Sequence, residues 1–310
     1  MPDRTLESLR ERRLALKGPT RTPLGGFRPV NTTFRREFDL YAGIRPSRAY
    51  EGIRTPFPGT DLVVVRMTHE DLYAGIEFPL GEPATDELRA LIARTEGSEI
   101  AEDAAISIKP LSVGASERLA RRAFQYAQEN GRRRVTCVHK ANVIKRSDGL
   151  FLDAVRRVAE NEYPGIPFDD RRVDSLCGEL VMHPQEFDVM VMPLMYGDIV
   201  SDIGAGLTGG LGMAPGVNLG DDCAVFEAVH GTAPRHAGKN RVNPCGLLLS
   251  GVMLLRHVGE DEAADRVEQA LESVIKEGRN VTYDLKPTRD DPTAVGTREF
   301  AEAVVAAMAP

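Results

Sequence analysis

Short apolar runs, rich in β-branched residues, alternate with helical patterns along most of this 310-residue chain. The runs Leu62–Val65, Val135–Val138 and Val189–Met192 are typical of strands buried on both faces of a sheet. Helical patterns lie around them, over residues 116–130, 148–161, 175–183, 244–257, 261–276 and 297–308. Strands that alternate with helices predict an α/β fold with a mainly parallel sheet.

The first of these helical patterns has clear end signals. Ser116 is predicted as its N-cap and Gly131 as its stop, with apolar residues at Leu119, Ala123 and Ala127 between them. We therefore expect this helix to cover one face of the sheet.

The segment from Tyr73 to Ala115 has a different character. Pro79, Gly81 and Pro83 precede acidic helical residues and short isoleucine-rich strands, so we expect an insertion or an arm. No internal repeat or low-complexity linker is present, and a second lobe therefore has to arise from the chain crossing between lobes.

Composition and charge exclude several classes of function. With 42% hydrophobic and 27% charged residues, the chain has enough apolar material for a large core in one or two domains. The net charge is −7 and the basic residues are scattered, so nucleic acid is not expected as a partner.

No run approaches the roughly 18 apolar residues of a membrane span, and the charged opening residues lack the apolar centre of a secretory signal. We expect a cytoplasmic protein without membrane contact, and the four widely separated cysteines predict neither a disulfide framework nor a zinc site.

Two carboxylates, Asp198 and Asp202, lie four residues apart at the start of a predicted helix, so both project from one face. Together they can chelate a hard divalent cation, and all-oxygen ligation suits Mg²⁺ or Mn²⁺ better than zinc. An N-terminal turn with one acidic cap is the simpler alternative.

Basic residues at strand ends and in loops indicate an anionic ligand. Lys140 follows a buried strand, at the end where open α/β sheets place their ligands, and a lysine desolvated there can act as a base. The alternative is an ordinary surface lysine. Arg35, Arg45 and Arg66 lie in loop or strand-end settings, with Asn31 nearby, and guanidinium groups suit a substrate with several carboxylates. Arg35 has the alternative of a solvated helix face.

Two glycine-rich segments follow. Residues 204–216 contain six glycines, which allow either close approach of a ligand to the backbone or tight helix packing. Residues 227–240 form a long loop dense in glycine, histidine and cations, which could close over a phosphorylated ligand. A single histidine such as His230 is more often structural.

In order and spacing, these blocks resemble the isocitrate and isopropylmalate dehydrogenases, most closely the NADP-dependent isocitrate dehydrogenases. The resemblance runs from about Leu16 to the C-terminus and is carried by KGPTRTPLGGFRPVN, DLYAGIRP, EDLYAGIE, VHKAN, YGDIVSD, GMAPGVNLGDDCAVFEAVHGTAP, VNP and VTYD. It implies an isopropylmalate dehydrogenase-like, two-lobed α/β fold. Residues 1–40 and 210–310 would form a large cofactor-side lobe, and residues 41–209 a small substrate and dimer lobe with a dimer-forming arm over about residues 71–112.

The resemblance implies an active site shared between the subunits of a homodimer. Asp198 and Asp202 would bind Mg²⁺ or Mn²⁺ in one subunit, and Asp174 would be a third ligand from the neighbouring subunit, together with Lys140. Lys140, directly or through Asp174, would remove the hydroxyl proton of the substrate, and Tyr73 would act with it in proton transfer. Hydride would pass to the nicotinamide before the β-keto acid loses CO₂.

The same resemblance implies the binding residues. Those that would contact the substrate, a small tricarboxylate, are Asn31, Arg35, Arg45 and Arg66. Those that would contact the cofactor are Thr22, His230, Gly231, Ala233, Arg235, His236, Asn243 and Tyr283. NAD-dependent relatives place an aspartate where this chain has Arg235, and an arginine there attracts a 2′-phosphate. NADP is therefore the expected cofactor, with NAD as the alternative.

Four departures from the family pattern bear on these expectations. The family opens with a strand, a glycine-rich turn and a helix that have no counterpart before Met1, so we expect a fold truncated at its N-terminus. Pro29 stands where isocitrate-specific relatives have a serine that contacts the distal carboxylate, and proline cannot donate that hydrogen bond. Leu194 replaces an asparagine, and Lys286-Pro287 replace an arginine expected beyond Tyr283.

The function expected from this set is oxidative decarboxylation of isocitrate to 2-oxoglutarate with NADP and a divalent metal. Pro29 leaves open the same chemistry on another 2-hydroxy acid, namely homoisocitrate, isopropylmalate or tartrate, although Asn31 argues against isopropylmalate. The absent N-terminal unit leaves open a non-catalytic regulatory subunit. Such subunits usually lose their acid, base or metal groups, whereas this chain retains Tyr73, Lys140, Asp174, Asp198 and Asp202.

Overall fold

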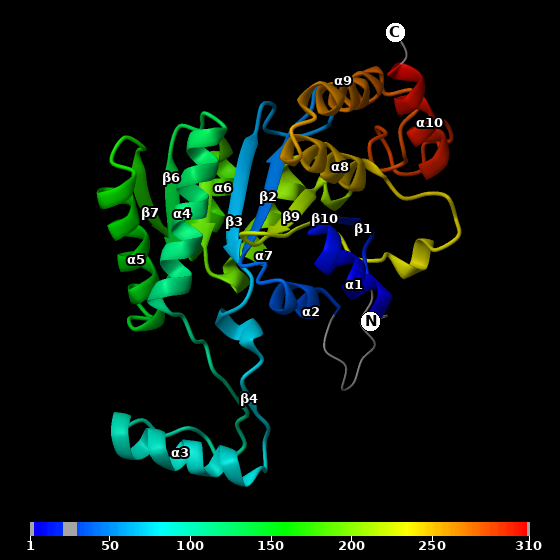
Figure 1. Cartoon of the computed structure of the whole chain (residues 1–310). Helices are drawn as coiled ribbons and strands as arrows, with labels where there is room; N and C mark the ends of the chain where they lie inside the picture. The colour runs from blue at the N-terminus through cyan, green and yellow to red at the C-terminus, as the bar shows by residue number, and fades with distance from the viewer. Residues whose placement is uncertain (1–2, 21–29, 309–310) are drawn as a thin grey trace.

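One large sheet with helices on both faces forms the body of the molecule in the computed structural model, which describes residues 3–20 and 30–308 (Figure 1). Its eight strands lie in the order β1-β10-β9-β2-β3-β8-β6-β7. Their bounds are β1 Leu14–Lys17, β2 Ala42–Arg48, β3 Asp61–Met67, β6 Val135–His139, β7 Phe168–Arg172, β8 Val189–Met192, β9 Pro215–Leu219 and β10 Ala224–Ala228. The three apolar runs predicted as strands are confirmed as β3, β6 and β8, which are neighbours in the sheet.

The sheet is mixed. β3, β8, β6 and β7 run parallel to one another, and β1 pairs in parallel with β10. β9 is antiparallel to both β10 and β2, and β2 is antiparallel to β3. Four parallel pairings against three antiparallel ones confirm the predicted α/β fold with its mainly parallel sheet. The sequence pattern did not predict the antiparallel pairings. β2 with β3 and β9 with β10 are consecutive strands, whereas the pairing of β2 with β9 joins distant parts of the chain.

Strands from the two predicted lobes lie at opposite ends of the sheet. β1, β9 and β10 come from residues 1–40 and 210–310, and β2, β3, β6, β7 and β8 come from residues 41–209. β2 and β9 pair where the two sets meet. The division into lobes itself stays a prediction.

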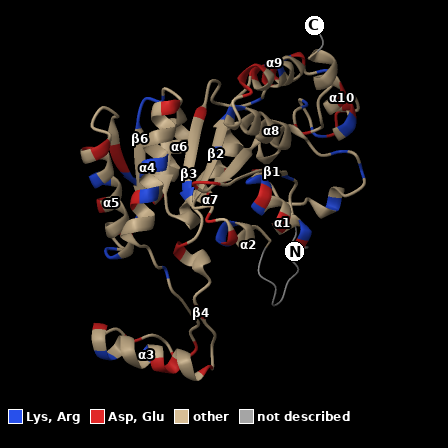
Figure 2. Ribbon diagram, in the orientation of Figure 1, with Lys and Arg blue, Asp and Glu red and all other residues tan. Residues whose placement is uncertain are grey.

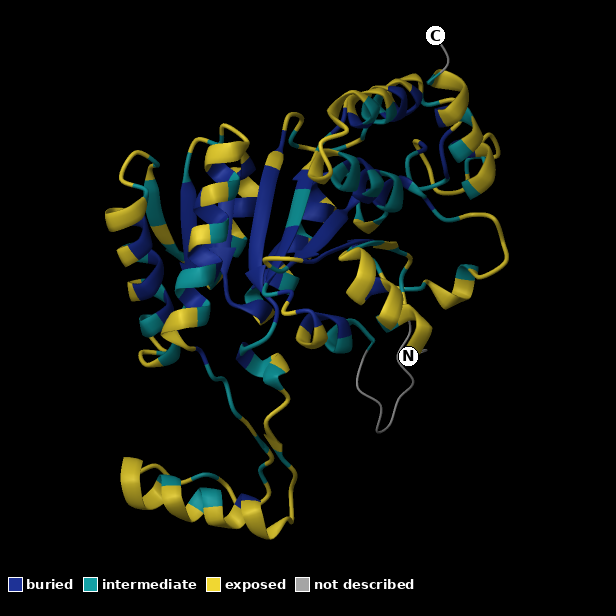
Figure 3. Ribbon diagram, viewed as in Figure 1, coloured by how far each residue is buried: buried dark blue, intermediate teal, exposed yellow. Residues whose placement is uncertain are grey.

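Helices cover both faces of the sheet. The helices of the described chain are α1 Asp3–Arg12, α2 Val30–Glu37, α3 Pro83–Glu96, α4 Val113–Glu129, α5 Ser147–Glu162, α6 Val173–Met182, α7 Leu194–Leu207, α8 Cys245–His257, α9 Asp261–Glu277 and α10 Thr297–Ala307, with 3₁₀ turns η1 Asp71–Ala74, η2 Pro184–Glu186, η3 Leu211–Met213 and η4 Pro234–His236. Alternate residues of one strand pack on opposite layers: Val63 and Val65 of β3 contact the core shared with α4 and α5, whereas Leu62 and Val64 pack with residues of α6 and α7. The inner strands are therefore buried on both faces, whereas the edge strands β1 and β7 are partly exposed, and the outer helix surfaces are exposed, as Figure 3 shows.

One predicted helix boundary was wrong. α4 begins at Val113, and its N-cap is Ser112, whose hydroxyl accepts a hydrogen bond from the amide of Ala115. Ser116 is buried inside the helix and its hydroxyl donates to the carbonyl of Ser112. The additional turn is stabilised by Glu70, whose carboxylate accepts hydrogen bonds from the amide and the hydroxyl of Ser112. Local sequence cannot decide which of two serines, four residues apart, is the N-cap. The contact with Glu70, which is distant in the sequence, favours Ser112.

The predicted arm is confirmed as a structural feature. β4 (Glu77–Phe78) and β5 (Ile106–Ser107) pair as a two-stranded antiparallel sheet, and α3 lies at its tip, away from the body (Figure 1). Most of α3 is exposed (Figure 3). Its role in forming a dimer stays a prediction.

The surface carries mixed charges. Figure 2 shows acidic and basic residues interspersed along outer helices such as α4, α5 and α9. Over residues 3–20 and 30–308, no helix combines the length and the apolar character needed to cross a membrane.

Candidate active site

A cluster of charges lies where α7 packs against β2 and β3. α7 begins at Leu194, so Asp198 lies in its second turn and Asp202 follows one turn later. Nη1 of Arg45, on β2, lies 2.9 Å from Oδ1 of Asp198, and Nη1 of Arg66, on β3, lies 3.1 Å from the same oxygen. The structure thus brings a predicted metal ligand together with two predicted substrate arginines.

Arg66 is the most deeply buried of these residues, with only 1% of its surface exposed. Its Nε and Nη1 make no hydrogen bond, in spite of the short distance to Asp198. Desolvation is the main cause of the lowered pKa of Arg66, and the charges of Arg45 and Arg35 add to it. Two guanidinium groups pair with Asp198, and the charge of Arg35 acts on the same carboxylate. This concentration of positive charge suits an anionic ligand.

Arg35 also belongs to this cluster. The alternative of a solvated helix face is wrong for Arg35, because it is buried and its Nε donates to Oδ1 of Asn218 at 3.1 Å. The exposed side of α2 carries Arg36 instead, which donates to the carbonyl of Ala74. Desolvation lowers the pKa of Arg35, and the nearby charge of Glu227 opposes that change.

A cavity of about 120 Å³ joins residues predicted for the substrate with residues predicted for the cofactor. Asn31, Arg35 and Arg45 line it together with His230 and Gly231, which follow β10. These five predicted residues therefore share one pocket.

The polar wall of this cavity, formed by Asn218 and Glu227, was not predicted from the sequence. Glu227 accepts hydrogen bonds from Nδ2 of Asn218, at 2.8 Å, and from Nζ of Lys17. Desolvation opposes ionisation of Glu227, but the charge and hydrogen bond of Lys17 outweigh it, so the pKa is lowered. Asn218 and Glu227 are polar residues inside the apolar strands β9 and β10, and that pattern was the signal that could have identified them.

Tyr73 and Asp202 flank Asp198. Tyr73 belongs to η1, directly after β3, and its hydroxyl interacts with the carboxylate of Asp198. Partial desolvation, and then the charge of Asp198, raise the pKa of Tyr73. Partial desolvation also raises the pKa of Asp202, with a contribution from Asp198, whereas Arg66 and Arg45 hold the pKa of Asp198 below its ordinary value against the effect of burial.

Lys140 and Asp174 form a separate pair. Nζ of Lys140, just beyond β6, lies 2.6 Å from Oδ1 of Asp174 in the first turn of α6, and this hydrogen bond lowers the pKa of Asp174. Within the described chain, no hydrogen bond or ion pair joins this pair directly to Asp198 or Asp202, and no group of three or more histidine, cysteine, aspartate or glutamate side chains is placed to hold a metal ion. Asp174 as a third metal ligand stays a prediction that requires a second subunit.

Aromatic and cationic residues gather on the predicted cofactor side. The rings of His236, in η4, and Tyr283 are stacked, with centroids 6.2 Å apart. The guanidinium group of Arg241 lies 4.4 Å from the centroid of Tyr283, and the exposed Arg235 precedes His236 in the same turn. Arg241 was not predicted, because it lies outside the blocks that carry the resemblance.

Other residues on the predicted cofactor side either make hydrogen bonds within the chain or lie outside the described residues. Nδ2 of Asn243 donates to Asp284, and its Oδ1 accepts from the amide of Cys245. Nζ of Lys286 donates to the carbonyls of Gly278 and Arg279, so Lys286 does not replace the arginine expected beyond Tyr283. Ala233 precedes η4 with a left-handed backbone, at φ 41°. Thr22 and Pro29 lie outside the described residues.

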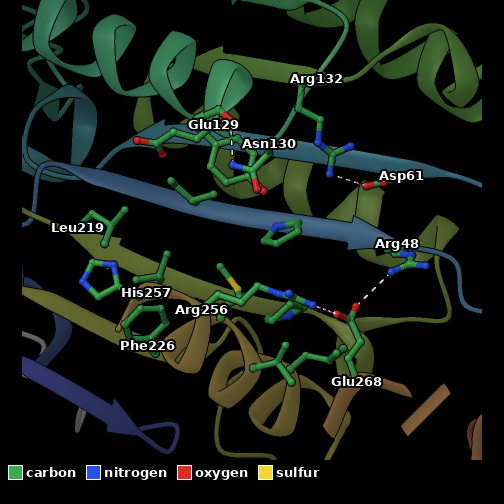
Figure 4. Close-up of a pocket in the computed structure, with 18 of the residues that line it drawn as sticks. Arg48, Asp61, Glu129, Asn130, Arg132, Leu219, Phe226, Arg256, His257 and Glu268 are labelled. Carbon is green, nitrogen blue, oxygen red and sulfur yellow. Dashed lines mark hydrogen bonds and ion pairs between the residues drawn. The ribbon is translucent and has the colours of Figure 1, made fainter. Parts of the chain in front are cut away.

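A larger cavity, of about 600 Å³, lies on the opposite face of β2 and β9, between α4 and α8 (Figure 4). Arg132 pairs there with Asp61 at 2.9 Å, and Arg48 pairs with Glu268 at 3.1 Å, as the dashed lines show. Glu268 also pairs with Arg256. None of the predicted site residues lines this cavity, and most of its cations already have carboxylate partners.

The fold and the site together define an α/β protein with an arginine cluster suited to carboxylates beside a pair of helix-borne aspartates. A comparison of sequences gives the family: the profile described as isocitrate/isopropylmalate dehydrogenase matches residues 1–304. The chain belongs to the isocitrate/isopropylmalate dehydrogenase family.

Individual relatives agree with this assignment. The chain is 44% identical over 286 residues, which cover 92% of it and 70% of the relative, to a protein of Drosophila melanogaster named probable mitochondrial NAD isocitrate dehydrogenase subunit alpha. It is 41% identical over 329 residues, which cover 98% of it and 79% of the relative, to the NADP isocitrate dehydrogenase of Archaeoglobus fulgidus. The crystal structure of isocitrate dehydrogenase from Methylococcus capsulatus matches with a TM-score of 0.89 and 45% identity, over 99% of this chain and 85% of that one.

These comparisons confirm the predicted family, the fold and the enzyme class of NAD(P)-dependent decarboxylating dehydrogenases. The names of the relatives include both cofactors, so the choice between NADP and NAD has to be argued from residues of this chain.

Proposed function

We propose that this chain catalyses the oxidative decarboxylation of isocitrate to 2-oxoglutarate with NADP and a divalent metal. The observation that carries the proposal is the cluster of Arg35, Arg45 and Arg66 around Asp198, in which two buried nitrogens of Arg66 make no hydrogen bond. A substrate with several carboxylates supplies the acceptors that this cluster lacks. The cytoplasmic location expected from the sequence is kept as part of this proposal.

The residues present fit a divalent metal. Asp198 and Asp202 offer carboxylate oxygens from successive turns of one helix, and such hard donors suit Mg²⁺ or Mn²⁺. Desolvation and repulsion from Asp198 raise the pKa of Asp202. A bound cation would offset both effects, because its positive charge stabilises the ionised carboxylate. When bound, the metal would act as a Lewis acid on the hydroxyl and carbonyl oxygens, and NADP would accept the hydride.

The protein side chains bind the substrate and move protons. The three arginines hold and orient its carboxylates. Tyr73, whose pKa is raised, keeps its proton at neutral pH and is placed beside Asp198 to donate it. We assign the base to Lys140 with Asp174, supplied by the neighbouring subunit of a homodimer. The absence of a direct bond between this pair and Asp198 in the described chain, and the exposed arm at α3, support this assignment.

The choice of NADP is supported by the loop beyond β10. Arg235 and Arg241 are exposed cations next to the stacked rings of His236 and Tyr283. Such a group can stack on an adenine and bind a 2′-phosphate. Lys286 is committed to main-chain carbonyls, so the phosphate would depend on the arginines of the loop.

The decisive experiment is an assay of the purified protein with isocitrate, Mg²⁺ or Mn²⁺ and NADP, followed by NADPH absorbance. We expect Asp202→Asn to reduce turnover at least about 100-fold and to abolish the metal dependence, because one of two hard ligands in the chain is lost. Asp153→Asn, an exposed carboxylate on α5, is the matched control. Undiminished, metal-dependent turnover by Asp202→Asn would contradict the metal assignment.

The same assay tests the substrate and the alternative of a regulatory subunit. Homoisocitrate, isopropylmalate and tartrate should be turned over less efficiently than isocitrate, despite Pro29. If one of these acids is turned over more efficiently than isocitrate, that acid is the substrate and the proposal of isocitrate is wrong. Binding of NADP without turnover of any acid would instead support a non-catalytic subunit.

A second variant tests the cofactor. Arg235→Asp should lower kcat/KM for NADP by about tenfold to 100-fold, because a charge-assisted hydrogen bond to phosphate is replaced by repulsion. The value for NAD should change much less, since NAD has no 2′-phosphate. Lys239→Asp, which makes the same charge change in the same loop, is the control. Equal losses with both cofactors would show that Arg235 does not recognise the phosphate.

A further inference from the structure

Four charged or polar side chains outside the proposed substrate site form a second buried cluster: Asp71, Lys109, Asp148 and Tyr196. They come from η1, the segment that follows strand β5 of the arm, the first turn of α5 and the first turn of α7. The side chains of Asp71 and Asp148 are completely buried, and that of Lys109 is 14% exposed. Two buried carboxylates thus share one ammonium group.

Asp148 has a bonding partner for each oxygen. Its Oδ1 pairs with Nζ of Lys109. Its Oδ2 accepts the main-chain N–H of Lys140 at 2.7 Å and the hydroxyl of Tyr196 at 3.0 Å. One carboxylate therefore connects the loop of the proposed base, the helix of the proposed metal ligands and the base of the arm.

Asp71 completes the cluster from the other side. Its Oδ2 accepts the amide of Met195 at 2.8 Å, in the first turn of α7, where a negative charge stabilises the helix dipole. Its Oδ1 accepts the amide of Leu72 and lies 3.9 Å from Nζ of Lys109. Asp71 begins η1 with a left-handed backbone, at φ 67°, and the same turn carries Tyr73.

We propose that Asp148 is a positioning residue of the active site, which sets the main chain of Lys140 relative to α7 and, through Lys109, relative to the arm. A fully buried carboxylate with three bonds cannot move without leaving charged or polar groups unpaired, so the segments that it joins keep one arrangement. This inference rests on the proposed function for the catalytic roles of Lys140 and of the aspartates of α7. If Lys140 serves the neighbouring subunit, Asp148 also links the two active sites of the dimer.

Asp148→Asn tests the proposal in the intact protein, because it keeps the shape and removes the charge. We expect kcat with isocitrate to fall at least about tenfold while KM changes less than about threefold, since the substrate arginines lie on β2, β3 and α2. Tyr196→Phe removes one hydrogen bond to Asp148 and should lower kcat by a few-fold, with KM again unchanged. Asp153→Asn, on the same helix and exposed, is the control for both.

Amide hydrogen exchange provides a readout that does not depend on activity. In Asp148→Asn, residues 139–146 and 194–199 should exchange at least about tenfold faster than in the parent protein, with α9 unchanged. Faster exchange throughout the chain would show general destabilisation and would overturn the proposal. Unchanged exchange in the two segments would overturn it as well. So would a higher KM without a lower kcat in Asp148→Asn. A parent protein without isocitrate turnover would instead count against the proposed function, and the exchange experiment would still test the positioning role.

Discussion

Arg66 shows most directly how a single residue defines the proposed substrate site. A fully buried guanidinium group without hydrogen bonds at Nε and Nη1 is unfavourable in the ligand-free protein, particularly beside Arg35 and Arg45. A bound carboxylate corrects both the charge and the missing acceptors. Arg66 therefore favours an anion as the ligand of the proposed site.

Arg66→Met should separate the contribution of Arg66 to substrate binding from its contribution to the stability of the fold. KM for the substrate should rise at least about tenfold, because a charge-assisted interaction is lost. The free energy of unfolding without substrate should stay constant or increase by up to about 2 kcal/mol, since an apolar side chain of similar length replaces a charge without adequate partners. Arg36→Met, on the exposed side of α2, should change both quantities little. Enzyme kinetics and calorimetry make the test, and a large loss of stability in Arg66→Met would show that Arg66 is structural.

At the scale of one element, α7 owes its place against the sheet to glycine. A Cβ atom at Gly197 would lie 2.3 Å from Cβ of Arg66, and one at Gly204 would lie 2.9 Å from Oγ of Ser47. The glycines therefore let the helix approach β2 and β3 closely enough for Asp198 to reach Arg45 and Arg66. This is the tight helix packing that was one of the two alternatives predicted for residues 204–216, and Gly197 extends it about two turns towards the N-terminus.

Two glycine variants of α7 should have opposite effects. Gly197→Ala should destabilise the protein by about 1–3 kcal/mol and lower kcat/KM, because the helix has to move away from Arg66. Gly206→Ala has no atom within 4 Å of its new methyl group and should stabilise the protein by about 0.5–1 kcal/mol with unchanged kinetics. Denaturant unfolding with steady-state kinetics measures both. Equal stabilities of the two variants would refute the close packing at Gly197.

At the scale of the whole molecule, the described chain contains two groups of residues that we propose as partial sites. Asp198 with the arginines forms one, and Lys140 with Asp174 forms the other, with only the indirect connection through Asp148 and Tyr196. The exposed arm extends from the same body (Figure 1). A homodimer that combines the first partial site of one chain with the second of its partner is the arrangement that we propose.

Complementation of variants tests this arrangement. Lys140→Met and Asp202→Asn homodimers should each be inactive, whereas co-expressed chains should recover about a quarter of the parent activity, because half of randomly formed dimers are mixed and each mixed dimer has one intact site. Sedimentation confirms that dimers have formed. Mixed dimers without activity would show that each active site is built within one chain.

The elements themselves follow from local patterns. Strands β3, β6 and β8 and helix α9 were located because apolar periodicity and end signals depend on neighbours in the chain. The aspartates of α7 and the histidine-rich loop were identified for the same reason, helped by the resemblance to a known family. The antiparallel pairing of β2 with β9 was not predicted, because its partners are far apart in the sequence.

The surroundings of each site residue depended on contacts between distant segments. Burial of Arg35 against Asn218 joins positions 183 residues apart, and the N-cap of α4 was selected by Glu70 from another element. The cluster around Asp148 shows the same limit, since its residue types are ordinary and only their burial beside one another makes them unusual. Local sequence specifies which helix or strand a segment can form. Desolvation and charge pairing of a side chain arise only when distant segments of the folded chain enclose it, so the tertiary structure decides them.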